Sequence, residues 1–310
     1  SKLSECREQE LIKAFYSSLT DAITTNADLA FLPIDDHLCH RGHAVFDTCT
    51  LSNGRIYRLR THLDRFLASA QGARIDLPLS RAQIENIILR TAAASGLKDG
   101  SVRFWLSAGP GDFFITPKRD ASAFYCVIFV GSALQHKVGE APPAIPEVTV
   151  RDVPLKPAAL SSIKTNNYLL NSLTALRARD LGGTFGILVD EKGFIAESCV
   201  LNVSFVLPDK TLVTPTFDHA LNGTTVRKCL ELARASLIGD GLIRDAEQRP
   251  ISEEEAHTAV EIFLTGGDLH LYAVTSWDGE PVGDGQVGPV ATRLLAALEE
   301  ETSHGSSEHL

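Results

Sequence analysis

A lysine at position 164 is the first residue of this chain whose type and setting could do chemistry. Lys164 lies between an apolar residue and a stretch expected to begin a helix, in the sequence SIKTNNYL. Taken alone it is most simply a surface lysine, because lysine is almost never buried without a partner. In a pocket, however, a lysine amine can attack an aldehyde. Lys164 is therefore a candidate nucleophile if other segments supply the rest of a site.

A carboxylate at position 197 interrupts an apolar, strand-like segment over residues 193–205. Glu197 could be an exposed carboxylate on an edge strand. It could also pair with the protonated nitrogen of a pyridine cofactor, which would keep that cofactor able to withdraw electrons. The second interpretation matters only in combination with the other segments.

Two further segments could hold a phosphate. Residues 221–227, LNGTTVR, place Gly223, Thr224 and Thr225 where a helix is expected to start. Free backbone N–H groups and the helix dipole favour a phosphate there, although a threonine that only caps the helix would give the same pattern. Arg65 follows Thr61 by one helical turn and would project near the first turns of its helix, where most charges are simply solvated.

Composition bounds the class of protein. The chain has 310 residues, enough for two domains, and 44% of them are hydrophobic and 22% charged. A net charge of -10 disfavours binding to nucleic acids or to anionic membranes. No pair of the six cysteines has metal-site or CxxC spacing, so we expect no metal and a reducing, intracellular location in the cytoplasm or an organelle lumen. The longest apolar stretches have the length of strands, so no membrane span is expected.

Periodicity and turn signals predict mixed helices and strands. A helix is expected over 8–24, where apolar residues recur at helical spacing, and a hairpin turn at Ser52-Asn53-Gly54. The other expected helices are 61–70, 80–94, 167–180, 223–235 and 289–300. The expected strands are 44–51, 55–59, 102–108, 124–130, 148–153, 186–190, 194–195, 203–207, 211–213 and 261–265, with a hairpin over 272–282.

Hairpins outnumber regular strand-helix-strand units, which favours two α+β domains over a doubly wound sheet. We expect a small N-terminal α+β domain over 1–132 and a larger C-terminal α+β domain over 147–301 that carries Lys164. The proline-rich stretch 133–146 is expected to be a linker, and 302–310 a disordered tail.

The four segments together, in this order and at these separations, resemble the class IV aminotransferases, also called fold-type IV pyridoxal-phosphate enzymes. The resemblance runs from about residue 37 to 295. It is carried by GHAVFDT with NGRIYRLRTHLDR, by IKTNNYL, by DEKGFIAES with LNV, by LNGTTVRKCLELA and by FLTGG. It implies the two-domain fold of the D-amino-acid aminotransferases, pyridoxal 5'-phosphate as cofactor, and a homodimer whose pocket a loop of the partner subunit completes.

The resemblance also implies roles for individual residues. Lys164 matches the lysine that binds the cofactor aldehyde and then serves as general base. Glu197 matches the acid on the pyridine nitrogen, with Asn202 as its support, and Tyr168 matches a tyrosine near the ring hydroxyl. The residues matching the phosphate site are Arg65, Gly223, Thr224, Thr225, Thr265, Gly266 and Gly267.

The substrates implied are an amino donor and a 2-oxo acid acceptor. The candidate residues on the substrate side are His43, Phe46, Arg103 and Trp105, with the loop 107–112. Arg103 lies in an otherwise apolar strand, where an unpaired cation would be costly, so a carboxylate of the substrate or of the protein is its expected partner.

The stretch VRFWLSAGPGDF resembles plant-type D-amino-acid transaminases, so a small D-amino acid is the favoured donor. A branched-chain L-amino acid and an (R)-amine stay open. The alternative reaction is that of 4-amino-4-deoxychorismate lyase, which releases pyruvate with the same cofactor and lysine. A protein that binds the cofactor without catalysis is the third hypothesis.

Overall fold

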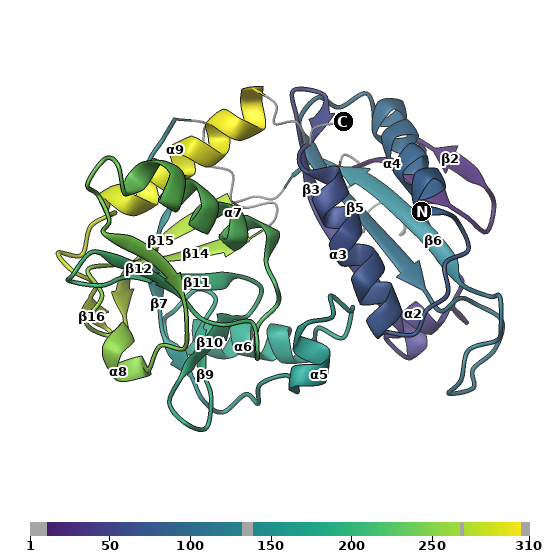
Figure 1. Cartoon of the computed structure of the whole chain (residues 1–310). Coiled ribbons are helices and arrows are strands. Elements are labelled where there is room, and N and C mark those ends of the chain that lie inside the picture. The colour runs from purple at the N-terminus through teal and green to yellow at the C-terminus, as the bar shows by residue number, and fades with distance from the viewer. Residues whose placement is uncertain (1–10, 132–138, 267–269, 305–310) are drawn as a thin grey trace. The chain divides into compact units, whose positions relative to one another are not determined.

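The computed structural model describes residues 11–131, 139–266 and 270–304 and divides into two compact units (Figure 1). Within the described residues, the N-terminal unit is formed by 11–131, 163–167 and 302–304, and the C-terminal unit by 139–162, 168–266 and 270–301. Both units contain helices and strands, so the expected α+β class is confirmed.

An antiparallel sheet organises the described part of the N-terminal unit, in the order β2-β1-β6-β5-β3-β4. Helices α3 and α4 cover one face of this sheet (Figure 1). The strands are β1 Ile12–Ser17, β2 Ala22–Thr24, β3 Ala44–Ser52, β4 Arg55–Ile56, β5 Gly100–Ser107 and β6 Ala123–Phe129. The helices are η1 Ala27–Leu29, α2 His37–His40, α3 Leu59–Gly72 and α4 Arg81–Ser95.

Strand β3 shows why the two faces of this sheet differ. Its side chains alternate, so Val45, Cys49 and Leu51 enter the core beneath α3 and α4. Phe46 and Thr48 therefore point to the opposite face, together with Arg103 and Trp105 of β5. The expected substrate-side residues of the two strands thus share one face of the sheet.

The C-terminal unit is built in layers. Strands β13, β12, β11, β14, β15 and β16 follow one another in the larger sheet, with β7 parallel to β15, and a smaller sheet runs β10-β9-β8. The strands are β7 Ala144–Glu147, β8 Thr149–Val150, β9 Ile187–Val189, β10 Ile195–Ser198, β11 Asn202–Val206, β12 Thr211–Thr214, β13 Asp245–Gln248, β14 Glu261–Gly266, β15 His270–Trp277 and β16 Glu280–Pro281. The helices are α5 Ala158–Ser161, α6 Leu169–Asp180, α7 Thr224–Leu232 with a π-helical continuation η2 Ala233–Leu237, α8 Glu253–Ala256 and α9 Pro289–His304.

Three apolar clusters hold these layers together. On one face of the larger sheet, Phe263 packs with residues of α7 and α9. On the other face, Phe205 packs with Ile187 and Ile195 of the smaller sheet, whose far side carries α6 through Ala178. These layers fix β10, β11 and the start of α7, which carry the expected residues for the ring nitrogen and the phosphate.

The helix expected over 8–24 is wrong for the described residues. The structure has β1 and β2 there, joined by a turn in which Asp21 has a φ of 47°. Strand β1 pairs with β6 from Ile12↔Phe129 to Ser17↔Tyr125, so sheet pairing overrides the helical spacing of a short apolar run.

Three boundaries also differ from the expectation. Residues 144–146 of the expected linker belong to β7, because β7 pairs in parallel with β15, while residues 132–138 lie outside the described part. The expected disordered tail is helical at its start, since α9 continues to His304, and residues 305–310 are not described. Helix α3 begins at Leu59 after Arg58, whose φ is 51°, and so the expected strand 55–59 is reduced to β4.

Across the three described stretches of chain, no helix combines the length and the apolar character that a membrane span requires.

Candidate active site

Lys164 is held by backbone contacts with β3 and α3. The Phe46 N–H donates to the Lys164 carbonyl at 2.9 Å, and the Lys164 N–H donates to Ser69 Oγ at 3.1 Å. A bridge between Val45 and Thr165 extends this pairing. These bonds place residues 163–167 in the N-terminal unit, whereas the sequence predicts Lys164 in the C-terminal domain. Pairing with a strand more than a hundred residues away leaves no local signal in the sequence.

The Lys164 amine consequently emerges at a defined place. Its side chain is half-buried, and Nζ lies 4.6 Å from the centroid of the Phe46 ring. An ammonium above an aromatic face is attracted by the ring quadrupole, and this attraction orients the side chain. Phe46, expected on the substrate side, therefore lies next to the expected nucleophile.

Arg65 projects from α3 onto a buried carboxylate of β3. Its Nε donates to Asp47 Oδ2 at 2.8 Å and its Nη2 donates to Asp47 Oδ1 at 2.7 Å. His62 Nδ1 lies 2.9 Å from the same Oδ1. Burial alone would raise the pKa of Asp47, but the charges of Arg65 and His62 outweigh it and hold that pKa well below its ordinary value. Asp47 and His62 were not among the predicted residues.

Arg103 and Trp105 line an apolar cavity of about 410 Å³ on the sheet face opposite α3 and α4. Arg103 Nε donates to Thr48 Oγ1 at 2.9 Å, and its guanidinium carbon lies 5.6 Å from the ring centroids of both Phe46 and Phe129. No carboxylate within the described residues forms an ion pair with Arg103. The partners of Arg103 within the protein are therefore the Thr48 hydroxyl and the rings of Phe46 and Phe129, in place of the carboxylate that the sequence allowed for.

His43 has a different setting from the other expected substrate-side residues. Its Nε2 lies 2.8 Å from the carbonyl oxygen of Ala73, just after α3. A ring nitrogen that donates to a backbone carbonyl fixes the imidazole and its tautomer. His43 thus contributes to holding the end of α3 against the start of β3.

In the C-terminal unit, Glu197 is a buried carboxylate on β10, not an exposed edge residue. The Leu221 N–H donates to Glu197 Oε2 at 3.0 Å, and Asn202 Nδ2 donates to the Leu221 carbonyl at 2.9 Å. Asn202 therefore contacts Glu197 indirectly, through the backbone of Leu221.

The start of α7 is shaped for an anion. Gly223 caps the helix without a side-chain hydrogen bond, and a Cβ at that position would lie 1.9 Å from Asn202 Oδ1. The buried hydroxyl of Thr265 has no hydrogen-bond partner among the described residues, and Thr225 Oγ1 donates to the Gly266 carbonyl at 3.2 Å. A helix start without a side-chain cap, beside a buried hydroxyl that has no partner among the described residues, fits a phosphate, as the sequence predicts for these residues and for Thr224. Gly267 lies outside the described residues.

Tyr168 stands at the start of α6 and has an unpredicted neighbour. Lys156 Nζ lies 4.7 Å from the centroid of the Tyr168 ring. Burial lowers the pKa of Lys156, and the negative charge of Glu197 partly restores it. Lys156 therefore joins two expected cofactor residues electrostatically. Its position in a proline-rich stretch carried no signal in the sequence.

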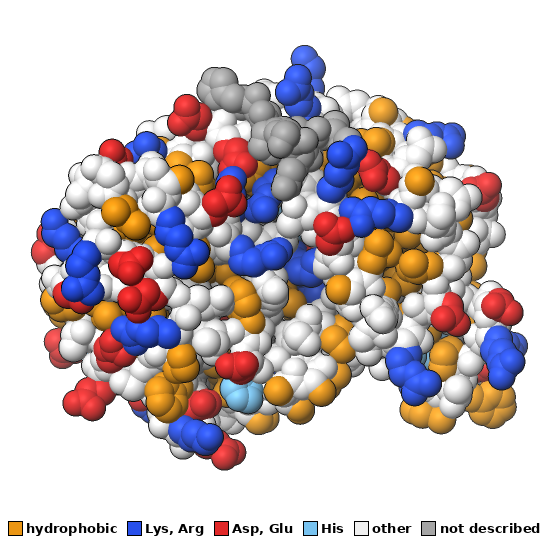
Figure 2. All heavy atoms as spheres, in the orientation of Figure 1, with side chains coloured by type: hydrophobic (Ala, Val, Ile, Leu, Met, Phe, Trp, Pro, Cys, Tyr) orange, Lys and Arg blue, Asp and Glu red, His pale blue; other side chains and the backbone are white. Residues whose placement is uncertain are grey.

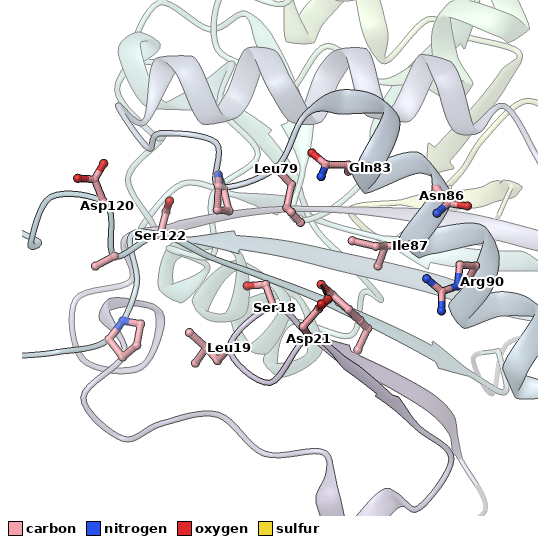
Figure 3. Close-up of a pocket in the computed structure, with 14 residues that line it drawn as sticks. Ser18, Leu19, Asp21, Leu79, Gln83, Asn86, Ile87, Arg90, Asp120 and Ser122 are labelled. Carbon is pink, nitrogen blue, oxygen red and sulfur yellow. Dashed lines mark hydrogen bonds between the residues drawn. The ribbon is translucent and has the colours of Figure 1, made fainter.

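A further cavity, of about 700 Å³, lies away from the residues expected to bind the cofactor. It lies between α4 and the turn after β1, and Figure 3 shows Gln83, Asn86 and Arg90 of the helix facing Ser18 and Asp21. Of the predicted site segments, the loop 107–112 reaches this cavity through Pro110, and the other predicted residues do not line it. The expected site residues thus form two groups, one around Lys164, Arg65 and Arg103 in the N-terminal unit and one around Glu197 and the start of α7 in the C-terminal unit.

Comparisons with known proteins identify one family. A family model described as amino-transferase class IV matches residues 44–277. The chain is 38% identical over 306 residues to the chloroplastic D-amino-acid transaminase of Arabidopsis thaliana, covering 98% of this chain and 80% of that protein. It is 28% identical over 270 residues to a putative branched-chain-amino-acid aminotransferase of Methanocaldococcus jannaschii, covering 86% and 89%.

A solved structure has the same fold. The branched-chain amino acid aminotransferase of Escherichia coli superimposes with a TM-score of 0.84 at 24% identity, and the match covers 94% of this chain and 95% of that one.

Proposed function

We propose that this chain, which belongs to the class IV aminotransferase family, moves an amino group from a small D-amino acid to a 2-oxo acid. Family membership carries the broader statement: the chain is an aminotransferase whose cofactor is pyridoxal phosphate. The identity and the handedness of the donor are our proposal. The support for the D-series is the 38% identity to a D-amino-acid transaminase, which spans nearly the whole chain.

The observation that carries the proposal is the placement of Lys164. Both backbone groups of this residue are bonded, and its amine lies over the Phe46 ring. When bound, pyridoxal phosphate supplies an aldehyde that takes up the amino group and a ring that withdraws electrons. Lys164 would hold that aldehyde between turnovers and, once released, act as the general base that takes the proton from the substrate α-carbon.

The other residues bind and orient. The buried Glu197 carboxylate would accept a hydrogen bond from the protonated pyridine nitrogen, and Tyr168 would lie toward the ring hydroxyl. Arg65, the N–H groups at the start of α7 and the Thr265 hydroxyl would hold the phosphate, with Gly223 leaving room for it. A desolvated carboxylate and fixed N–H donors stabilise such charges without reorganising during the reaction.

Arg103 is the residue that we propose for the carboxylate of the substrate. Its guanidinium is half-buried beside an apolar cavity and shares a face of the sheet with Phe46. A substrate carboxylate would neutralise this cation, and the apolar lining would accept a small side chain.

A panel of amino donors tests the proposal. The protein is mixed with D-alanine, L-leucine or an (R)-amine without an acceptor, and the absorption band of the bound cofactor is followed. We expect D-alanine to convert the aldehyde form to the amine form fastest, and 2-oxoglutarate to reverse the change. Faster conversion by L-leucine would reject the D-preference. The Lys164→Ala variant, with its fold checked by circular dichroism, should show no turnover.

The same panel separates the alternative activities. A lyase would release pyruvate from 4-amino-4-deoxychorismate without an acceptor and without accumulating the amine form. A protein that only binds the cofactor would show no spectral change with any donor.

A homodimer is also part of the proposal. The loop between β5 and β6 exposes Phe113, Phe114 and Ile115 by 60%, 75% and 78% of their surface. Hydrophobic side chains gather at the lower right of Figure 2, over α2 and this loop. Exposed apolar patches of this kind mark interaction sites. Analytical ultracentrifugation should give twice the mass of the chain, and a Phe114→Ser, Ile115→Ser variant should sediment as a monomer.

We further propose an intracellular, reducing location. The five cysteines within the described residues form no disulfide with one another, and four of them are buried. Treatment with a reductant should therefore leave the stability of the protein unchanged.

A further inference from the structure

Asp47 is a charged residue on the core face of a strand, where charge is costly. It lies on β3 between Val45 and Cys49, both of which belong to the apolar core beneath α3 and α4. Its side chain is fully buried. An isolated carboxylate in such a place would be expelled or protonated, so Asp47 must be compensated by specific partners.

The partners of Asp47 come from two successive turns of α3. Arg65 meets the carboxylate with two parallel N–H donors, Nε on Oδ2 at 2.8 Å and Nη2 on Oδ1 at 2.7 Å. His62 Nδ1 lies 2.9 Å from Oδ1, and the N–H of Thr48 donates to Oδ1 at 2.7 Å. Because an ionised carboxylate only accepts, the His62 proton is on Nδ1. Burial lowers the pKa of His62, and the neighbouring charge of Asp47 works against that shift.

This arrangement fixes the plane of the Arg65 guanidinium. A bidentate pair with a carboxylate defines both the position and the rotation of the fork, whereas a single bond leaves it free to swing. An arginine side chain otherwise has many rotamers, and ordering them on binding a ligand lowers affinity. Asp47 and His62 therefore order Arg65 before any phosphate arrives.

We propose that Asp47, supported by His62, is a positioning residue that holds Arg65 in the orientation in which it binds the phosphate of the cofactor. This rests on the proposed function, in which Arg65 is a phosphate ligand. The role is orientation and not charge, because Asp47 offsets the positive charge that an anionic ligand would seek. Both buried groups belong to one unit of the protein, so the arrangement exists in the absence of a ligand.

Orientation and charge predict opposite signs for one substitution. If only net charge mattered, Asp47→Asn would make the net charge around Arg65 more positive and would tighten phosphate binding. If orientation matters, Asp47→Asn removes one acceptor of the fork, lets Arg65 sample other rotamers and weakens phosphate binding. The direction of the change in affinity therefore decides between the two.

The experiment compares two ligands that differ only in the phosphate. Cofactor-free protein is titrated with pyridoxal phosphate and with pyridoxal, and dissociation constants are read from the absorption band and from tryptophan fluorescence. For Asp47→Asn we expect the dissociation constant of pyridoxal phosphate to rise about tenfold, while that of pyridoxal stays unchanged. Unchanged or tighter binding of pyridoxal phosphate would overturn the proposal, and so would an equal loss for both ligands.

Two controls keep the result interpretable. Asp36→Asn changes another fully buried carboxylate of the same unit, one that accepts from Tyr125 and Ser107, and it should leave the ratio of the two dissociation constants unchanged. In an Arg65→Ala background, Asp47→Asn should have no further effect on that ratio, because nothing is left to orient.

A second variant covers the case in which Asp47→Asn does not fold. His62→Gln leaves the pair between Asp47 and Arg65 in place but removes one support of the carboxylate. It should weaken pyridoxal phosphate selectively, by a smaller factor. An unchanged ratio in this variant would count against the proposal. If the unsubstituted protein binds neither ligand, the proposed function itself fails, which is a different outcome from binding that is indifferent to residue 47.

Discussion

Arg103 carries its charge on the rim of an apolar cavity, held by a hydroxyl and two aromatic rings and not by a carboxylate of the described residues. If it receives the substrate carboxylate, Arg103→Leu should raise KM for amino-acid donors by about 10- to 100-fold, the equivalent of about 1.5–3 kcal/mol for a hydrogen bond to a charged group. The reaction of an amine without a carboxylate should be unaffected. Steady-state kinetics with matched donors measures both.

Thr48→Val is the matched control for Arg103, since it removes only the acceptor of Nε. It should change KM in the same direction by a smaller factor. An equal loss with both kinds of donor in Arg103→Leu would assign Arg103 to packing instead of to substrate recognition.

Lys156 supplies a second prediction at the residue scale. Burial lowers the pKa of its amine, and the charge of Glu197 works against that shift. Lys156 should therefore react with an amine-selective acylating reagent at a lower pH than the exposed lysines, and Glu197→Gln should move its reactivity to still lower pH. Mass spectrometry of peptides labelled across a pH series measures this. If the pH profile of labelling at Lys156 is the same in the unsubstituted protein and in Glu197→Gln, the two charges do not interact.

Residues of the expected site were predictable from the sequence where a local pattern marks them. Gly223 and its two threonines mark a helix start, and the structure has α7 there, uncapped. Glu197 stood out as a carboxylate in an apolar strand, and it is buried. Asp47 is likewise a carboxylate in an apolar strand, but its role could not be predicted from the sequence. Its partners His62 and Arg65 lie on the following helix and contact it only through tertiary packing.

At the scale of elements, α4 shows a helix that the sequence specifies locally. Ser80 accepts from the N–H of Gln83 while the Gln83 side chain accepts from the N–H of Ser80, and Gly96 ends the helix with a φ of 68°. Ser80→Ala should lower the free energy of unfolding by about 1 kcal/mol, whereas Ser80→Asp, which keeps an acceptor at the cap, should retain most of it. Urea denaturation followed by circular dichroism measures the loss. Equal stability of the two variants would mean that the cap contributes nothing.

The elements predicted wrongly were those without local signals such as helix caps or turn residues. The segment 11–24 has apolar residues at helical spacing but no cap and no glycine stop. Its residues 12–17 form β1, because they pair with β6. Likewise, residues 144–146 are expected in a linker because of their proline, yet they belong to β7, which pairs in parallel with β15. In both cases a distant strand supplies the hydrogen bonds, so a window of neighbouring residues could not reveal the outcome.

At the scale of the whole molecule, the sequence predicted two α+β units but not how the chain is shared between them. Residues 163–167 leave the C-terminal stretch of chain and bond to β3 and α3, which places Lys164 in the N-terminal unit. Bringing residues 163–167 to β3 costs little loop entropy, because the entropic cost of closing a loop grows only slowly with the number of residues in it. It assigns the expected nucleophile to the unit that also carries Arg65 and Arg103.

The stability of the whole protein should also depend on pH through one buried carboxylate. Glu147 ends β7 with only 1% of its surface exposed and accepts hydrogen bonds from the N–H groups of Phe185 and Gly186. Burial raises the pKa of Glu147 to about 7, more than those hydrogen bonds lower it. The folded state therefore holds a proton that the unfolded state releases near the ordinary glutamate pKa of 4.5.

The sign of the effect follows from this difference. Below about pH 4.5 both states are protonated and the contribution of Glu147 is fully present, and it is lost as pH rises from there through about 7. Glu147→Gln mimics the protonated form and does not titrate, so it should match the unsubstituted protein at pH 4 and exceed it at pH 8 by about 3 kcal/mol in free energy of unfolding. The exposed carboxylate of Glu280 gives a control, since Glu280→Gln should leave the pH profile unchanged. Denaturant titrations at half-unit pH steps measure the difference, and parallel profiles for the unsubstituted protein and Glu147→Gln would show that Glu147 stays ionised within the fold.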